Sequence, residues 1–86
     1  MDRRSNRGSG SGEIRFEVEE HICTIAENES GWTKELNLVS WNGRPAKYDI
    51  RDWSPDHKKM SRGITLTADE LQALKDGLEE DMKYWR

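Results

Sequence analysis

Residues 32–53, WTKELNLVSWNGRPAKYDIRDW, decide the fold of this chain. Asn42 and Gly43 divide the stretch in two. An Asn-Gly pair is the strongest short-range signal for a hairpin, because a two-residue turn of this type needs a positive φ at both positions. The flanking residues predict strands over 32–41 and 46–53. These two strands should therefore pair antiparallel around the turn.

The segments on either side add two more strands. Ile14, Phe16 and Val18 alternate with charged residues, which predicts a strand that either bends near residues 19–21 or runs on through Ile25. The turn cluster at residues 28–31 separates it from the hairpin. After a break at Ser54-Pro55-Asp56-His57, residues 63–66 predict a short fourth strand.

A helix is expected from residue 67 almost to the C-terminus. Thr67 and Glu70 have the spacing of a capping box, in which each side chain bonds the other residue's backbone. Apolar residues then follow at helical spacing and form one stripe, namely Leu71, Leu74, Leu78, Met82 and Trp85. Trp85 is expected in the core or in a dimer interface. Four strands followed by one helix make an α+β fold.

The chain has 86 residues, enough for one domain. Residues 1–12 end in Gly-Ser-Gly-Ser-Gly and are interpreted as a flexible tail or an expression scar, which leaves residues 13–86 as the domain. Cys23, the single cysteine, excludes an intramolecular disulfide and is expected to be a packed small hydrophobe. Neither a membrane span nor a secretory signal is apparent, so a soluble, cytoplasmic protein is expected.

Charge is distributed unevenly along a chain whose net charge is -3. Residues 34–62 hold seven Lys and Arg against four Asp and Glu, whereas residues 13–33 hold six Glu and one Arg. A basic middle between acidic segments is compatible with a local anion site. The same distribution is also within the range of an ordinary solvated surface.

The third predicted strand carries the candidate functional residues. Its alternation separates Tyr48 and Ile50, which can face the core, from a second set expected to face solvent, namely Lys47, Asp49, Arg51 and Trp53. Cations beside a flat aromatic ring are what single-stranded nucleic acid requires. The alternative is that Trp53 covers the sheet edge and Arg51 pairs with Asp49 or Asp52.

Neighbouring segments extend this candidate surface. Trp41 and Arg44 flank the Asn42-Gly43 turn, and the loop before the fourth strand contributes Lys58, Lys59 and Arg62. Catalysis has little support, because no nucleophile elbow, phosphate loop or metal-ligand spacing is present. The chain is therefore not expected to be an enzyme, and no cofactor is expected.

Three segments of the chain resemble a known family: Trp41-Asn42-Gly43-Arg44, residues 48–53 (YDIRDW) and residues 62–67 (RGITLT). In this order they resemble the positive cofactor 4 family of single-stranded-DNA-binding transcriptional coactivators. The motifs Lys34–Asn37, Val39–Asn42 and Trp53–His57 are most similar to its bacterial YdbC-like branch. The resemblance covers nearly all of residues 13–80.

The resemblance implies a curved four-stranded antiparallel sheet, a C-terminal helix and a homodimer with helices at its interface. It assigns the stacking aromatic to Trp41 and basic contacts to Arg44 and Arg51. Trp53 corresponds to an aromatic at the strand end, one residue closer to the arginine than in the family. The expected nucleic-acid-binding residues are thus Trp41, Arg44, Lys47, Arg51, Trp53, Lys58, Lys59 and Arg62.

The sequence therefore predicts a dimeric single-stranded-DNA-binding protein without enzymatic activity. It would act in transcription regulation, replication or repair, near the nucleoid and possibly with the transcription machinery as a partner. Two alternatives stay open. One is a protein-interaction module that docks an acidic partner, and the other is a single-stranded RNA binder with a translational role.

Overall fold

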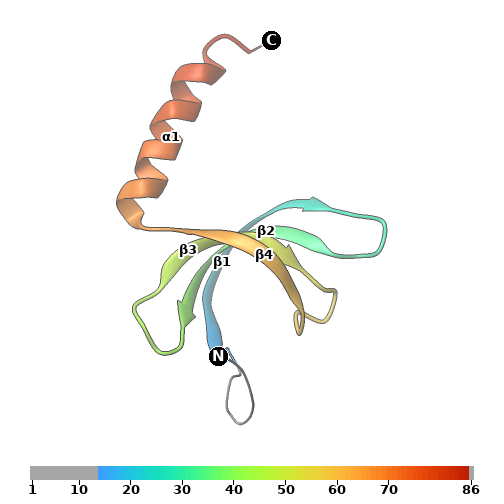
Figure 1. The fold of residues 1–86 in the computed structure, drawn as a ribbon. Helices are drawn as coiled ribbons and strands as arrows, with labels where there is room; N and C mark the ends of the chain where they lie inside the picture. The colour runs from blue at the N-terminus through green and yellow to red at the C-terminus, as the bar shows by residue number, and fades with distance from the viewer. Residues whose placement is uncertain (1–13, 86) are drawn as a thin grey trace.

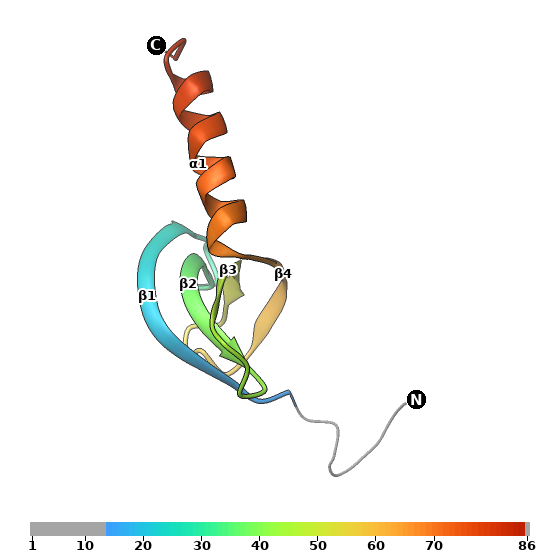
Figure 2. The same cartoon turned by 90° about the vertical axis from the view of Figure 1, so that its left-hand side faces the viewer.

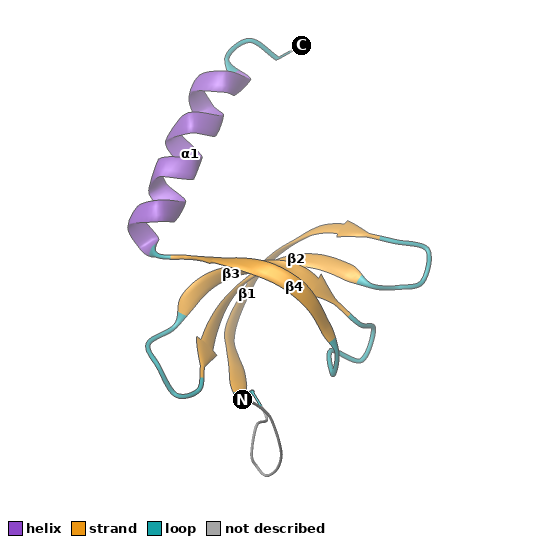
Figure 3. Cartoon of the chain, viewed as in Figure 1, coloured by secondary structure: helices purple, strands orange, loops and turns teal. Residues whose placement is uncertain are grey.

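The computed structural model describes residues 14–85 and contains four antiparallel strands followed by one helix (Figure 1, Figure 3). The elements are β1 (Phe16–Glu27), β2 (Thr33–Trp41), β3 (Lys47–Trp53), β4 (Met60–Leu66) and α1 (Ala68–Met82). The strands lie in the sheet in chain order. The predicted α+β class and element order are confirmed, and the predicted tail at residues 1–12 lies outside the described residues.

The β2–β3 hairpin turns where the Asn-Gly pair predicted. Asn42 and Gly43 have φ values of 53° and 75°, in the left-handed region that these two residue types tolerate. The Arg44 amide donates to the Trp41 carbonyl at 3.0 Å and closes the turn. The resulting register places Thr33 opposite Trp53, so these two side chains point to the same face of the sheet.

β1 is a single long strand with three irregularities. Its register against β2 shifts between Val18 and Glu20, between His21 and Cys23, and between Thr24 and Ala26. Each extra residue bends a strand and increases its twist. β1 accordingly wraps round the sheet, which acquires a concave and a convex face (Figure 2).

The concave face holds the most deeply buried side chains. Val39, Asp49 and Trp53 are each 0% exposed. Phe16, from the far end of the curved β1, brings its ring within 5.4 Å of the Trp53 ring centroid. The curvature lets the two ends of this face approach each other, so the face packs on itself within one layer of sheet.

The exposure expected for the third strand was wrong. Lys47 is exposed, but Asp49 and Trp53 are buried and the Arg51 side chain is only 13% exposed. The alternation predicted which side chains share a face, but it carries no information on curvature, and curvature turned that face inward. Tyr48, expected in the core, is only half-buried, and Cys23 is exposed rather than packed.

A buried ion pair lies at the centre of the concave face. Arg51 Nε and Nη2 donate to the two carboxylate oxygens of Asp49, each at 2.7 Å, and Arg51 Nη1 donates to the Ser61 carbonyl at 3.3 Å. Gly63 makes this arrangement possible, since a Cβ there would collide with the Ile50 carbonyl and with Arg51 Cβ. The structure therefore contains the alternative arrangement of this strand, in which Arg51 pairs with Asp49.

α1 begins with the predicted capping box. The Glu70 amide donates to Thr67 Oγ1 at 3.1 Å, and the Thr67 amide donates to Glu70 Oε1 at 2.8 Å. The helix then projects away from the sheet instead of lying across it (Figure 1, Figure 2). Its apolar stripe is left exposed, with Leu74, Leu78 and Met82 each more than 40% accessible.

The end of the helix corrects one expectation. α1 stops at Met82, and Trp85 is 63% exposed, with its Nε1 donating to Asp81 Oδ2 at 2.8 Å. Trp85 therefore does not extend the helical stripe or enter a core within this chain. No helix in residues 14–85 is long and apolar enough to cross a membrane.

Replacing Asp49 with Ala is expected to destabilise the fold by about 3 kcal/mol, because the charge of Arg51 would remain buried without its partner. Asp52→Ala, at the half-buried next position, is the control and should change little. The double variant Asp49→Leu/Arg51→Met should lose less than Asp49→Ala alone. Urea unfolding followed by tryptophan fluorescence measures all three, and an Asp49→Ala protein as stable as the wild type would contradict the role of this pair.

Candidate nucleic-acid interface

One end of the concave face forms a hollow of about 360 Å³ that we call the tryptophan hollow. Its lining brings together four of the eight predicted binding residues, Trp41, Arg44, Lys47 and Arg51. Trp41 comes from the last position of β2, Arg44 from the turn, and Lys47 and Arg51 from β3. Ile14, Pro45 and Thr65 complete it. Arg44 and Lys47 are exposed, so two cationic side chains border a half-buried indole.

Trp41 contacts two other side chains of the concave face. The Arg51 guanidinium carbon lies 4.6 Å from the centroid of the Trp41 ring, within the range of a cation–π contact. Phe16 lies 5.9 Å away at an interplanar angle of 45°. The Trp41 Nε1 donor has no hydrogen-bond partner among the described residues. The contacts with Arg51 and Phe16 thus fix the orientation of the indole, and its Nε1 is buried.

Arg51 is not placed like a surface arginine that is free to contact phosphates. Both carboxylate oxygens of Asp49 are bonded to it, so its charge is already paired. Its position against Trp41 makes it a support for that ring. Within residues 14–85, Arg44 and Lys47 form no ion pair, and these two side chains supply positive charge at the border of the hollow.

The other predicted residues lie elsewhere. Trp53 is in the core, where its ring contacts Phe16. Lys58 and Lys59 are exposed in the β3–β4 loop, and Arg62 lines a separate hollow of about 270 Å³ beside Lys34 and Gly63. The predicted residues therefore do not all border the tryptophan hollow, although Arg51 lines both this hollow and the one beside Arg62.

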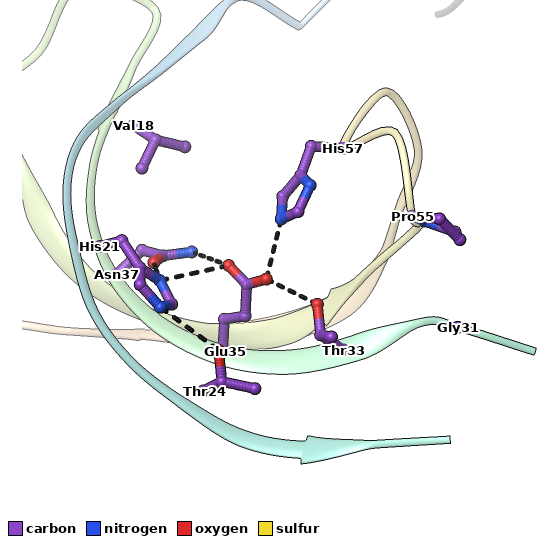
Figure 4. A pocket seen from close by; sticks show the side chains of 9 residues that line it. All are labelled: Val18, His21, Thr24, Gly31, Thr33, Glu35, Asn37, Pro55 and His57. Carbon is purple, nitrogen blue, oxygen red and sulfur yellow. Dashed lines mark hydrogen bonds and ion pairs between the residues drawn. The ribbon is translucent and has the colours of Figure 1, made fainter. Parts of the chain in front are cut away.

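A second hollow, of about 600 Å³, occupies the other end of the concave face (Figure 4). We call it the histidine hollow. It is lined by His21 of β1, by Thr33, Glu35 and Asn37 of β2, and by Pro55 and His57 of the β3–β4 loop, among others. None of these residues was among the predicted binding residues.

Glu35 is the centre of the histidine hollow. It is 5% exposed and accepts hydrogen bonds from Thr33 Oγ1 at 2.6 Å and from Asn37 Nδ2 at 3.1 Å. His57 Nε2 lies 2.8 Å from Glu35 Oε2, and His21 Nδ1 lies 3.4 Å from Oε1. Figure 4 shows the two imidazoles approaching the carboxylate from different elements.

The pKa of Glu35 is lower than the ordinary value for a glutamate. Burial acts in the opposite direction and raises the pKa, but hydrogen bonds from Thr33, His57 and Asn37 outweigh it, and the charge of His57 adds to their effect. The carboxylate is therefore ionised at neutral pH even though it is buried. A buried charge is tolerated here because each oxygen has partners.

The β3–β4 loop holds His57 in place. Asp56 Oδ1 accepts from the Lys58 amide at 3.0 Å and from Ser54 Oγ at 2.7 Å, and these bonds hold the pKa of Asp56 below its usual range. The Lys59 amide donates to Ser54 Oγ at 3.0 Å. His57 has a φ of 59°, and its ring stacks on Trp53 with centroids 5.8 Å apart.

The residues that β2 contributes to the histidine hollow could have been recognised from the sequence. Thr33, Glu35 and Asn37 occupy every second position of β2, a pattern that places three polar groups on one face of a strand. Nothing in the sequence indicated that His21 and His57 would meet there, because they lie 36 positions apart on different elements. Within residues 14–85, no group of three His, Cys, Asp or Glu side chains is arranged to hold a metal ion.

Glu35→Gln is expected to lower the free energy of unfolding at pH 7 by about 1.5 kcal/mol, the value of one hydrogen bond to a charged group. Because the folded pKa of Glu35 is lowered, its contribution is present above the ordinary glutamate value of about 4.3 and is lost as the pH falls through the folded value. Urea unfolding at pH 7 and in acid should show the difference shrinking. Glu29→Gln, in an exposed turn, is the control, and a difference independent of pH would contradict this account.

Comparison with known proteins identifies the family. The family described as Transcriptional Coactivator p15 (PC4) matches residues 28–77, from the turn after β1 into α1. A protein of Treponema pallidum (strain Nichols), described as uncharacterized, is 46% identical over 74 residues, which are 86% of this chain and 87% of that protein. The chain therefore belongs to the Transcriptional Coactivator p15 (PC4) family, the positive cofactor 4 family that its motifs resemble, and has a relative in a bacterium.

Proposed function

We propose that this chain binds single-stranded DNA on the concave face of its sheet, with little sequence preference and without catalysis. The observation that carries the proposal is the tryptophan hollow, where the fixed indole of Trp41 lies beside the exposed cations Arg44 and Lys47. Membership of a family of single-stranded-DNA-binding coactivators supports it.

The proposed contacts are of two kinds, electrostatic contacts with phosphates and stacking of a base on an aromatic ring. Arg44 and Lys47 attract phosphates, a contribution that falls as salt rises because counterions compete. Trp41 offers a surface to an unpaired base, and such stacking is worth about 1–3 kcal/mol per base. Arg51 acts through Trp41, whose ring it supports, since its own charge is paired with Asp49. Lys58, Lys59 and Arg62 are proposed as outer contacts for a longer strand.

The proposed cellular role is in transcription regulation, replication or repair, in association with the nucleoid. Base stacking does not by itself reject a 2′-hydroxyl. Competition between oligo-dT and oligo-U therefore decides between DNA and RNA, and matched duplex tests the preference for single strands.

We further propose that the working form is a homodimer. The apolar stripe of α1 is exposed in the single chain, and Ile64 on β4 is 55% exposed as well. A helix that projects from its own sheet with an uncovered stripe gains stability when a second copy covers that stripe. A chain of this length also buries only a small hydrophobic core, which by itself gives a single copy little stability.

Removing one cation from the tryptophan hollow should reduce the salt dependence of binding. Arg44→Gln and Lys47→Gln are each expected to lower the slope of log affinity against log salt by about 0.7, the value for one phosphate contact with a single strand. Lys75→Gln, which removes the same charge on α1, is the matched control. Fluorescence anisotropy with labelled oligo-dT at several salt concentrations measures the slopes.

Trp41→Leu should weaken oligo-dT binding by about 1–3 kcal/mol and leave the salt slope unchanged, because it removes stacking and no charge. Wild-type protein that binds duplex as tightly as oligo-dT, or binds neither at low salt, would refute the proposed function. If Arg44→Gln, Lys47→Gln and Trp41→Leu all fold and bind like the wild type, the binding face is another one.

The dimer is tested by placing a charge on the helical stripe. Wild-type protein should have a mass in solution of twice the 10.0 kDa of one chain. Leu78→Glu should give a monomer, because a carboxylate would be buried in the interface. Ala73→Glu adds the same charge on the other side of α1 and should remain dimeric. Light scattering after size exclusion measures the masses, and a monomeric wild type would reject the dimer.

A further inference from the structure

The histidine hollow has the construction of a contact site that the tryptophan hollow does not explain. His21 and His57 are half-exposed, at 49% and 50% of their side-chain surface, while Glu35 between them is almost fully buried. The carboxylate is therefore inaccessible to a large ligand, and the two imidazoles are the groups that a ligand would meet.

Both imidazoles are held by neighbouring side chains, His57 through one ring nitrogen and its stacked ring and His21 through both ring nitrogens. His57 Nε2 lies 2.8 Å from Glu35 Oε2, and its ring stacks on Trp53. His21 Nδ1 lies 2.7 Å from Asn37 Oδ1, and its Nε2 lies 3.3 Å from Thr24 Oγ1. Rings fixed in this way lose little freedom on binding, which favours them as contact groups.

The net charge of this hollow depends on protons. Glu35 contributes one negative charge, so with both imidazoles neutral the trio carries -1, and with both protonated it carries +1. Imidazole side chains as a class change charge between about pH 5 and 8, whereas Lys and Arg do not. Protonation of both imidazoles would therefore change the centre of the hollow from repelling to attracting a phosphate.

The surrounding charged groups do not cancel this change. On β3, Asp49 and Arg51 form a neutral pair. The β3–β4 loop brings Asp56 next to His57, and Lys58 and Lys59 follow it. β1 contributes His21 and β2 contributes Glu35 to the hollow itself. The charge at the centre of the hollow is therefore set by Glu35 and the two imidazoles.

The two hollows lie along one strand. Trp41, Val39, Asn37 and Glu35 occupy successive same-face positions of β2, with Val39 buried between the hollows. The six residue-to-residue steps from Glu35 to Trp41 span about 20 Å at about 3.3 Å each. A short single strand lying along β2 can therefore reach both hollows.

We propose that the histidine hollow is a second contact site for the bound single strand, in which protonated His21 and His57 engage a backbone phosphate. This inference rests on the proposed function and adds a property to it. The affinity for single strands rises as the pH falls, and the added affinity is sensitive to salt.

The test is the salt slope of oligo-dT binding at about pH 8 and about pH 5.5, the range over which imidazoles change charge. Thymine takes up no proton in this range, so the probe stays constant. The wild-type slope is expected to steepen at the lower pH by about 0.7 for each phosphate newly engaged. His57→Gln and His21→Gln should each reduce the change, and the double variant should abolish it.

Lys75→Gln is the control, since it removes a charge outside both hollows and should keep the full pH effect. Circular dichroism confirms that each variant folds. A wild-type slope that is the same at both pH values, or a pH effect that survives in the double histidine variant, overturns this inference and leaves single-strand binding intact. A wild type that fails to bind oligo-dT at either pH overturns the proposed function together with the inference.

Discussion

The bidentate ion pair between Arg51 and Asp49 lies at the centre of the concave face, and the other features of that face are arranged around it. A charge pair can be this deeply buried only because both carboxylate oxygens are bonded and the guanidinium also reaches a backbone carbonyl. Gly63 lets β4 approach closely enough for Arg51 to lie flat. Arg51 in turn supports Trp41 on one side of the face. The pair thus links the strand pairing of β3 and β4 to the orientation of the Trp41 ring, which borders the exposed cations Arg44 and Lys47.

Because the sheet is curved, side chains on its concave face are buried even though the sheet is a single layer. The three register shifts in β1 bend the sheet until Phe16 meets Trp53, and the two hollows lie at the two ends of the concave face. The hollows differ in chemistry. One has an indole and two cations that keep their charge, whereas the other has a buried carboxylate between two imidazoles. If both contact the same strand, one supplies an attraction that is constant with pH and the other supplies one that varies.

The stability of α1 has a different origin from that of the curved sheet. Its capping box defines its start through local hydrogen bonds, but its apolar stripe finds no cover within the described chain. Helices gain most of their stability from burying such a stripe. In the proposed dimer, a second copy supplies that burial. Because α1 projects away from the sheet, a dimer formed through it can leave both concave faces open to strands.

The order of the elements, the Asn42-Gly43 turn and the capping box at Thr67 were all predictable from sequence, because each depends on residues close together in the chain. The alternation of β3 also predicted which side chains share a face. Which face turns inward was decided only by the tertiary structure, since that depends on the cumulative bend of β1, and Trp53 was placed wrongly for that reason. The meeting of His21, Glu35 and His57 was equally inaccessible to sequence, because three elements distant in the chain come together only when the sheet curves. Local rules thus determined the elements, and long-range packing decided which side chains face one another.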